Sequence, residues 1–349
     1  MNRALKIAIS LFFGLLLSCG RKDYLLKEGE TFFKRARQYS DIDKDAVFDI
    51  VFPEVLGAEN LQIVSDTVLV IQNSSREADS MLFKAYSTKD YRFLGAFGLK
   101  GRGPGEFNAP LIVSSDSKLS TLYIRDNGTG EAYMVDLENA LNGRGVDYIK
   151  KIVLPGNNVD WVPFDERDIL SLVLENDELT FQLTGSQVYT FHPYKGIDAN
   201  RYITKMSSLL TGNKTARKVA CAMVCFPQII ILNASSYDVS SFAVDPSYRR
   251  WKSILNSPFG LESMQYYKHI TSSDKYIIAL YDGCSISTLA GQNHVPCIHV
   301  FNWDGEFLNI FRIKEAVRTM TMDSESTCLY CIDDATGKII RYDLSKVLK

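Results

Sequence analysis

The sequence lacks a large excess of charge of either sign. Its 39 basic and 41 acidic side chains leave a net charge of −2. A balance this close to neutral gives no positive field for gripping the phosphates of nucleic acid, which is therefore not an expected partner. A hydrophobic fraction of 46% excludes an intrinsically disordered chain. We expect a folded protein that binds something other than nucleic acid.

Long hydrophobic runs are absent as well. The N-terminal run, residues 7–17, has 11 residues, whereas a helix needs about 20 to cross a bilayer. Such a run after Arg3 and Lys6 is typical of a signal-peptide core. It is followed by Ser18-Cys19, and Leu16-Leu17-Ser18-Cys19 resembles the bacterial lipobox. The resemblance implies that residues 1–18 are removed and that Cys19 carries a lipid. An ordinary secretory signal with an incidental cysteine stays open as the alternative.

The residues after Cys19 bear on location and on the anchor. They are Gly20-Arg21-Lys22-Asp23, with no aspartate next to the cysteine and no acidic run. By resemblance to bacterial lipoproteins, this predicts an outer-membrane protein that faces the periplasm. Residues 19–45 are rich in charge and poor in pattern, so we expect a solvated tether with one short helix around Phe32 and Phe33.

From residue 46 onwards, short apolar segments alternate with turn residues. The segments of strand character are residues 47–51, 67–71, 119–124, 169–174, 276–281 and 297–301. No sustained helical pattern lies between them, except over residues 202–210. This spacing predicts an all-β fold.

Two internal repeats indicate the architecture. Residues 122–130 align with residues 329–337 at an offset of 207, and residues 93–97 align with residues 307–311 at an offset of 214. Propeller blades recur about every 40 to 50 residues, so these offsets suit copies four blades apart. Residues 46–349 are then predicted to form a six-bladed β-propeller with four-stranded antiparallel blades.

The ends of such a ring must meet. We expect the first strand of the domain, residues 47–52, to complete the last blade beside the strand that ends at Leu344, because this removes an open sheet edge.

A glycine-rich segment supports this architecture. Residues 98–110 read Gly-Leu-Lys-Gly-Arg-Gly-Pro-Gly-Glu-Phe-Asn-Ala-Pro, and residues 122–126 follow as Leu-Tyr-Ile-Arg-Asp. This order resembles an NHL-type propeller repeat. The chain from about residue 50 resembles the TolB-like six-bladed propeller lipoproteins of Bacteroidetes. The resemblance implies a fold and a location, and no reaction.

The same glycines could suggest a phosphate cradle, but a dinucleotide loop opens a helix. Here Pro104 and Glu106 follow Gly101 and Gly103, and Glu106 would repel phosphate. We therefore expect a tight connection between blades, with positive φ at several glycines. Because such connections lie on the face where propellers bind ligands, Arg102 and Glu106 are the candidate ligand-binding residues.

The remaining cysteines and histidines form no clear metal or catalytic pattern. Cys328 and Cys331 stand three apart in an expected strand and so point to opposite faces, which excludes a shared metal. Cys284 and Cys297 flank a long hairpin and are the best disulfide candidates. His294, Cys297 and His299 form a loose group of metal-ligating side chains. We predict no catalytic residue, no metal ligand and no cofactor.

Two functions fit these observations. The first is a non-catalytic binding propeller, held at the outer membrane by its lipid, whose loops bind a protein or glycan partner. The alternative is a metal-dependent hydrolase or lyase with an ion in the central channel. Three or more inward Asp, Glu, Asn or His side chains from different blades, converging within a few Å, would favour the enzyme, whereas a channel lined by apolar or unpaired residues would favour binding. Long loops at residues 196–218 and 283–296 are further candidates for partner contact.

Overall fold

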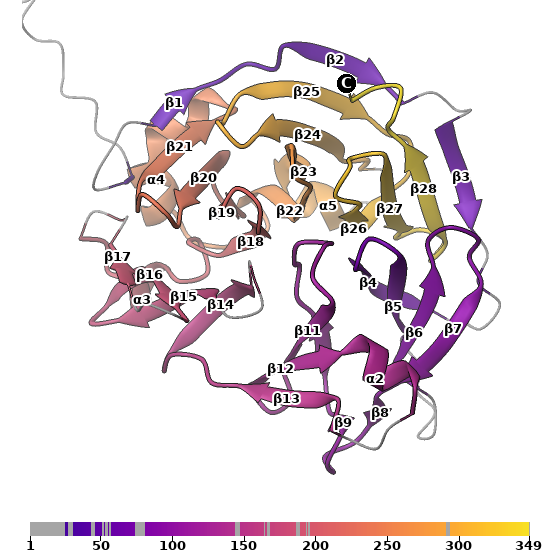
Figure 1. The fold of residues 1–349 in the computed structure, drawn as a ribbon. Coiled ribbons are helices and arrows are strands. Elements are labelled where there is room, and N and C mark those ends of the chain that lie inside the picture. Colours follow the sequence, from indigo (N-terminus) through magenta and orange to yellow (C-terminus); the bar gives the residue numbers. More distant parts are fainter. Residues whose placement is uncertain are drawn as a thin grey trace, which may run out of the picture.

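The computed structural model describes residues 25–26, 31–42, 46–50, 52, 55, 57–73, 81–143, 147–163, 165, 168–185, 189–192, 194, 196–290 and 294–348. Within them, six sheets surround a central axis as the blades of a propeller (Figure 1). Each blade has four antiparallel strands, which confirms the predicted six-bladed β-propeller. None of the helices in these ranges is both long and apolar enough to span a membrane.

The blades follow in chain order, and most first strands of neighbouring blades pack together around the axis. Blade one consists of β4 (Ala58–Val64), β5 (Val68–Asn73), β6 (Phe83–Ser87) and β7 (Phe93–Phe97). Blade two consists of β10 (Pro110–Ile112), β11 (Thr121–Asp126), β12 (Glu131–Asp136) and β13 (Ile149–Ile152). Blade three consists of β14 (Asn158–Pro163), β15 (Ile169–Glu175), β16 (Glu178–Thr184) and β17 (Tyr189–Phe191).

The second half of the ring repeats this order. Blade four consists of β18 (Ser208–Asn213), β19 (Lys218–Met223), β20 (Gln228–Asn233) and β21 (Val239–Ala243). Blade five consists of β22 (Met264–Ser272), β23 (Tyr276–Ser285), β24 (Cys297–Asn302) and β25 (Phe307–Arg312). Blade six consists of β26 (Val317–Met322), β27 (Cys328–Asp333), β28 (Ile339–Asp343) and β3 (Val47–Ile50).

Short helices lie in the connections: α2 (Leu137–Leu141), α3 (Ala199–Tyr202), α4 (Trp251–Asn256) and α5 (Ile286–Ala290). The helix considered over residues 202–210 is wrong, because α3 ends at Tyr202 and β18 begins at Ser208. The long loop expected at residues 196–218 is wrong for the same reason, since β18 is the first strand of blade four.

The cores lie between the blades. Six hydrophobic clusters are found, one at each contact between neighbouring blades. In β5, for example, Val70 packs towards blade two, whereas Leu69 and Ile71 pack towards blade six. Because successive side chains of a strand point to opposite faces and both faces are covered, inner strands read as nearly continuous apolar runs.

The ring closes as the sequence predicts. β3 pairs antiparallel with β28, with Val47 opposite Tyr342 and Ile50 opposite Ile339. The N-terminal strand therefore supplies the outermost strand of the last blade and covers the edge of β28.

The chain before β3 is not a solvated tether throughout. β1 (Thr31–Phe33) adds a parallel strand to β21 of blade four, and β2 (Gln38–Asp41) adds one to β25 of blade five. The helix expected around Phe32 and Phe33 is wrong, because this segment is β1. Leu25 and Leu26 are buried in the cluster between blades three and four. We call Leu25, Leu26, β1, β2 and β3 the N-terminal belt; its strands run along the outside of the ring, in indigo in Figure 1.

The repeats match the blades. β11 and β27 are the second strands of blades two and six, and β7 and β25 are the outer strands of blades one and five, so both pairs lie four blades apart. The turns agree in detail. The N–H of Gly130 donates to Asp126 O over 2.7 Å and that of Gly337 to Asp333 O over 2.8 Å, and both glycines have positive φ.

Candidate functional site

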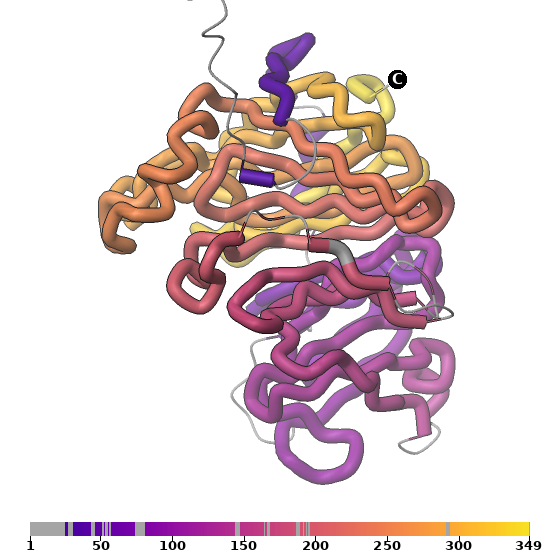
Figure 2. Tube along the Cα trace, turned by 90° about the vertical axis from the view of Figure 1, so that its left-hand side faces the viewer, coloured from indigo at the N-terminus to yellow at the C-terminus, as the bar shows by residue number. Residues whose placement is uncertain are grey.

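The connections of the ring form two faces. The loop face, as we call it, carries the connections between second and third strands and those from each blade to the next. The opposite face carries the turns between first and second strands and between third and fourth strands. In Figure 2, the orange segment that contains α4 and joins blade four to blade five projects from the ring.

Hydrogen bonds between turns close the opposite face. Asp66 in blade one accepts hydrogen bonds from Ser117 Oγ of blade two (2.6 Å) and from the Ser324 N–H of blade six (3.0 Å). Asp116 in blade two accepts one from the Lys214 N–H of blade four (2.7 Å), and burial raises the pKa of its carboxyl group. These bonds join non-adjacent as well as adjacent blades, so the turns on this face are tied to one another across the channel. A ligand is therefore expected on the loop face.

A cavity of about 290 Å³ occupies the central channel between the first strands. On its wall, His269 Nε2 of blade five lies 3.0 Å from Thr319 Oγ1 of blade six. Thr319 in turn donates to Asn60 Oδ1 of blade one (3.0 Å). Burial lowers the pKa of His269 to about 4, so its ring is neutral at pH 7.

Arg125 of blade two and Asp160 of blade three form an ion pair on the same wall. Asp160 also accepts a hydrogen bond from the Trp161 N–H (2.9 Å). Burial raises the pKa of Asp160, while the Arg125 charge opposes the rise. The pair places opposite charges where the channel meets a larger cavity.

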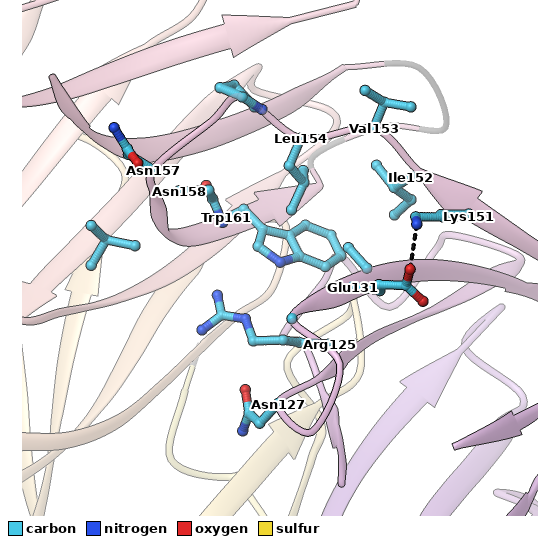
Figure 3. A pocket seen from close by; sticks show the side chains of 14 residues that line it. Arg125, Asn127, Glu131, Lys151, Ile152, Val153, Leu154, Asn157, Asn158 and Trp161 are labelled. Atoms are coloured by element: carbon cyan, nitrogen blue, oxygen red, sulfur yellow. Dashed lines mark hydrogen bonds and ion pairs between the residues drawn. The ribbon is translucent and has the colours of Figure 1, made fainter. Parts of the chain in front are cut away.

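That larger cavity lies between blades two and three, has a volume of about 610 Å³ and is shown in Figure 3. We call it the blade 2/3 pocket. Arg125 and Trp161 line both this pocket and the channel. Lys151 and Glu131 form an ion pair on another wall (Figure 3). Its remaining polar side chains are amides, namely Asn127, Asn157 and Asn158.

Two buried polar atoms of this pocket have no hydrogen-bond partner among the residues that the structure describes. They are Asn158 Oδ1, an acceptor, and Trp161 Nε1, a donor. Buried polar atoms of native proteins are nearly always paired with protein, water or ligand. The pocket therefore has hydrogen-bonding capacity that the surrounding chain does not use.

A metal site is not assembled in the described ranges. They contain no group of three His, Cys, Asp or Glu side chains able to hold an ion. In the channel, the Asp160 carboxylate is engaged by Arg125. Asn60 and His269 line the same cavity from blades one and five, and both contact Thr319. The channel thus holds inward polar groups from three blades, each engaged by a neighbouring side chain.

The glycine-rich connection lies on the loop face, between blades one and two, as expected. It contains the short parallel strands β8 (Leu99–Lys100) and β9 (Glu106–Phe107). Gly98 and Gly105 have φ of 75° and 80°. Glu106 Oε2 accepts a hydrogen bond from the Gly103 N–H (2.8 Å), and a Cβ at Gly101 would lie 1.9 Å from that oxygen. The Glu106 side chain thus stabilises the conformation of its own turn.

Arg102 is exposed at the tip of this turn, and neither it nor Glu106 lines the channel or the blade 2/3 pocket. Cys19 lies outside the described residues. The residues that do line the pocket were not singled out from the sequence. Arg125 lies within the repeat motif, where it reads as a strand residue, and Asp160 and Trp161 lie in the part of the chain with the least regular repeats.

The structure also places the cysteines. Cys284 and Cys297 are free thiols, so the disulfide considered for them is absent between these two residues. Cys331 packs between blades five and six and Cys328 between blades six and one, which confirms that the two point to opposite faces of β27.

These features define a six-bladed β-propeller with a polar pocket on one face. No protein-family model and no curated protein matches the sequence. The fold is similar to that of a DUF4221 family member from Bacteroides vulgatus, with a TM-score of 0.55 and 11% identity over 91% of this chain and 97% of that one. It is also similar to a Bacteroides fragilis protein named as exported, with a TM-score of 0.52 and 13% identity over 89% and 98%. Identities this low show a shared fold alone.

Proposed function

We propose that this protein is a binding propeller of the TolB-like, NHL-repeat type, anchored to the outer membrane through a lipid on Cys19 and facing the periplasm. Its ligand is a neutral glycan, held in the blade 2/3 pocket. The pocket carries the proposal, because it is large enough for a small ligand, for which volumes of about 300–1,000 Å³ are typical.

The charges of the pocket favour a neutral ligand. Arg125 is balanced by Asp160, and Lys151 by Glu131, so neither sign is in excess. The three asparagine amides can donate to and accept from hydroxyl groups, and Val153 and Leu154 offer an apolar wall beside them (Figure 3). A sugar carries hydroxyl groups on a ring with apolar C–H groups, so it matches both the amides and the apolar wall. Arg102, exposed on the same face, is proposed to contact the outer part of a longer ligand.

Binding is tested by titrating the purified protein with neutral and acidic oligosaccharides in calorimetry. The variants Asn127→Ala and Asn157→Gly should each weaken binding of the neutral glycan by about five- to tenfold, the loss of one net hydrogen bond. Glycine at position 157 keeps the backbone strain-free, because Asn157 has φ of 56°.

Asn142→Ala is the matched control, since Asn142 is exposed and follows α2 on the opposite face. It should leave affinity unchanged. Binding of acidic but not neutral glycans, or equal affinity in all three variants, would contradict the proposed ligand. A protein captured in place of any glycan would point to a protein partner instead.

The anchor rests on the signal-like N-terminus, and the name of the exported structural neighbour supports an extracytoplasmic location. Leu25, six residues after Cys19, is already buried. Because extended chain spans at most about 3.6 Å per residue, a lipid on Cys19 would hold the ring within roughly 22 Å of the bilayer. Metabolic labelling with palmitate should mark the natural protein in the outer-membrane fraction, and Cys19→Ala should abolish the label.

A further inference from the structure

A second cavity, of about 600 Å³, lies on the loop face between blades five and six. Lys268 of β22 and Asp282 of β23 line it from blade five, together with His294, and Asp334 lines it from the turn after β27 in blade six. We call it the blade 5/6 pocket. It shares no lining residue with the blade 2/3 pocket. Its chemistry is therefore independent of the binding proposed above.

A thiol, an imidazole and a carboxylate meet beside this cavity. His294 Nε2 lies 3.1 Å from Asp282 Oδ1, and His294 Nδ1 lies 3.6 Å from Cys284 Sγ. Asp282 is buried, and its Oδ2 accepts a hydrogen bond from Gln265 Nε2 (2.9 Å), which fixes the carboxylate. Cys284 and His294 are partly exposed, so a reagent can reach them.

His294 lies between Cys284 and Asp282, and this order decides what the three groups can do. The two nitrogens of an imidazole point away from each other, so Cys284 and Asp282 lie on opposite sides of the His294 ring and cannot share one ion. A nucleophile, a base and a carboxylate that orients the base are the arrangement of covalent catalysis.

We propose that Cys284 is a nucleophile for acyl groups of small esters, with His294 as its general base and Asp282 as the residue that orients His294. This goes beyond binding and adds a reaction at a different place on the loop face.

The proposed reaction has two balanced steps. Cys284 Sγ attacks the ester carbonyl carbon and forms a C–S bond, its proton passes to His294 Nδ1, the C–O bond to the alcohol breaks, and the alcohol takes the proton. Water then loses a proton to His294 and attacks the thioester, the C–S bond breaks, and Cys284 regains its proton. The products are a carboxylic acid and an alcohol.

The pKa shifts of Cys284 and Asp282 are consistent with a thiol that needs a base to become a nucleophile. Burial raises the pKa of Cys284, and the nearby Asp282 charge raises it further, so the thiol is protonated at pH 7 and needs a base. Burial also raises the pKa of Asp282, opposed by Lys268, His294 and Gln265. Lys268, which lines the same cavity, forms an ion pair with Asp334 (3.7 Å from Nζ to Oδ2).

The first test compares two thiols in the same unmodified protein. Cys328 is also partly exposed and also has a pKa raised by burial, and no histidine contact is found for it in the described ranges. Iodoacetamide at pH 7, followed by peptide mass spectrometry, should modify Cys284 about 100-fold faster than Cys328, within the range of base assistance. Equal rates would overturn the proposal without any variant having to fold.

The second test supplies an ester. With p-nitrophenyl acetate, one equivalent of nitrophenolate should appear in a burst, and the acetyl group should map to Cys284. His294→Gln keeps a hydrogen-bonding side chain but removes the base, and it should lower the burst rate about 100-fold at an unchanged melting temperature. Cys328→Ala is the control and should keep the full burst.

Two results would refute the reaction. One is acetylation confined to lysines, with Cys284 unmodified. The other is a burst rate unchanged by His294→Gln, because a merely structural histidine would leave that rate alone. Ligand binding at the blade 2/3 pocket is measured separately, so failure here does not decide the proposed function.

Discussion

His299 on β24 should make the protein acid-sensitive. Its ring is buried and stacks on Tyr281, with 4.1 Å between ring centroids and 19° between planes. Burial lowers its pKa to about 3, whereas a histidine in an unfolded chain has a pKa of about 6.5. The native state keeps the ring neutral, and the unfolded state takes up a proton below pH 6.5. The contribution of the neutral His299 ring to the free energy of unfolding is therefore fully present above pH 6.5 and is lost as the pH falls towards 3.

The magnitude follows from the two pKa values. A pH of 4.5 lies about two units below the pKa of the unfolded histidine, while the native ring stays neutral. Each of these units lowers the free energy of unfolding by about 1.4 kcal/mol. The loss between pH 7.5 and pH 4.5 is then about 2.7 kcal/mol for His299. His269, whose pKa burial lowers to about 4, adds a loss of similar size.

The assay is urea unfolding of the natural protein and His299→Phe at both pH values. Phenylalanine keeps the stacked ring and does not titrate, so the variant should lose about 2.7 kcal/mol less than the natural protein on acidification. Comparing the two losses cancels the carboxylates, which titrate in both proteins. If His299→Phe loses as much as the natural protein, the buried neutral histidine is not the cause.

Three further predictions test how the ring is held together, each measured by urea unfolding at pH 7.5. Asp66→Gly, which tolerates the φ of 56° at this position, should cost about 2–4 kcal/mol, because bonds to a charged acceptor are worth about 1.5–3 kcal/mol each before solvent screening; no loss would mean that the turns do not stabilise each other. Phe52→Ala should cost about 3–5 kcal/mol, since its ring is buried between blades six and one; a cost below about 1 kcal/mol would show that this contact is not formed. Gly305→Ala should cost about 1–3 kcal/mol more than Gly337→Ala. Both glycines have positive φ, but only at Gly305 would a Cβ meet a ring, that of Phe242, at 2.0 Å. Equal costs would refute that contact.

The blades could be predicted because each one leaves a pattern in the sequence. The Leu-Tyr start of β11 and β27 and the Asp and Gly of the turns after them are set by packing and by backbone conformation, so both survive in copies four blades apart. The belt strands β1 and β2 leave no such pattern. β1 and β2 join sheets through backbone bonds at an outer edge, with Phe32 and Tyr39 exposed. Their sequence, rich in charge, therefore resembles a tether.

The sites could not be predicted, because their residues meet only through the fold. Asp160 and Arg125 come from different blades, and nothing in their sequence spacing pairs them. At the blade 5/6 pocket, the sequence groups His294 with Cys297 and His299. His299 instead faces an aromatic core, and His294 turns to Asp282 and Cys284 across the hairpin. The loop at residues 283–296 was marked for partner contact, and it holds α5 and two of these residues.

The N-terminal belt also decides how mechanical load would enter the molecule. Tension on an anchored N-terminus would first reach the leucines buried between blades three and four, and then run lengthwise through the parallel pairings of β1 and β2. All the hydrogen bonds of each pairing would resist together. The force would reach β3 only after the pairings of β1 and β2 had both broken. The pairing of β3 with β28 is the one that closes the ring. On such a path, the belt would carry the load before it reached the pairing that closes the ring.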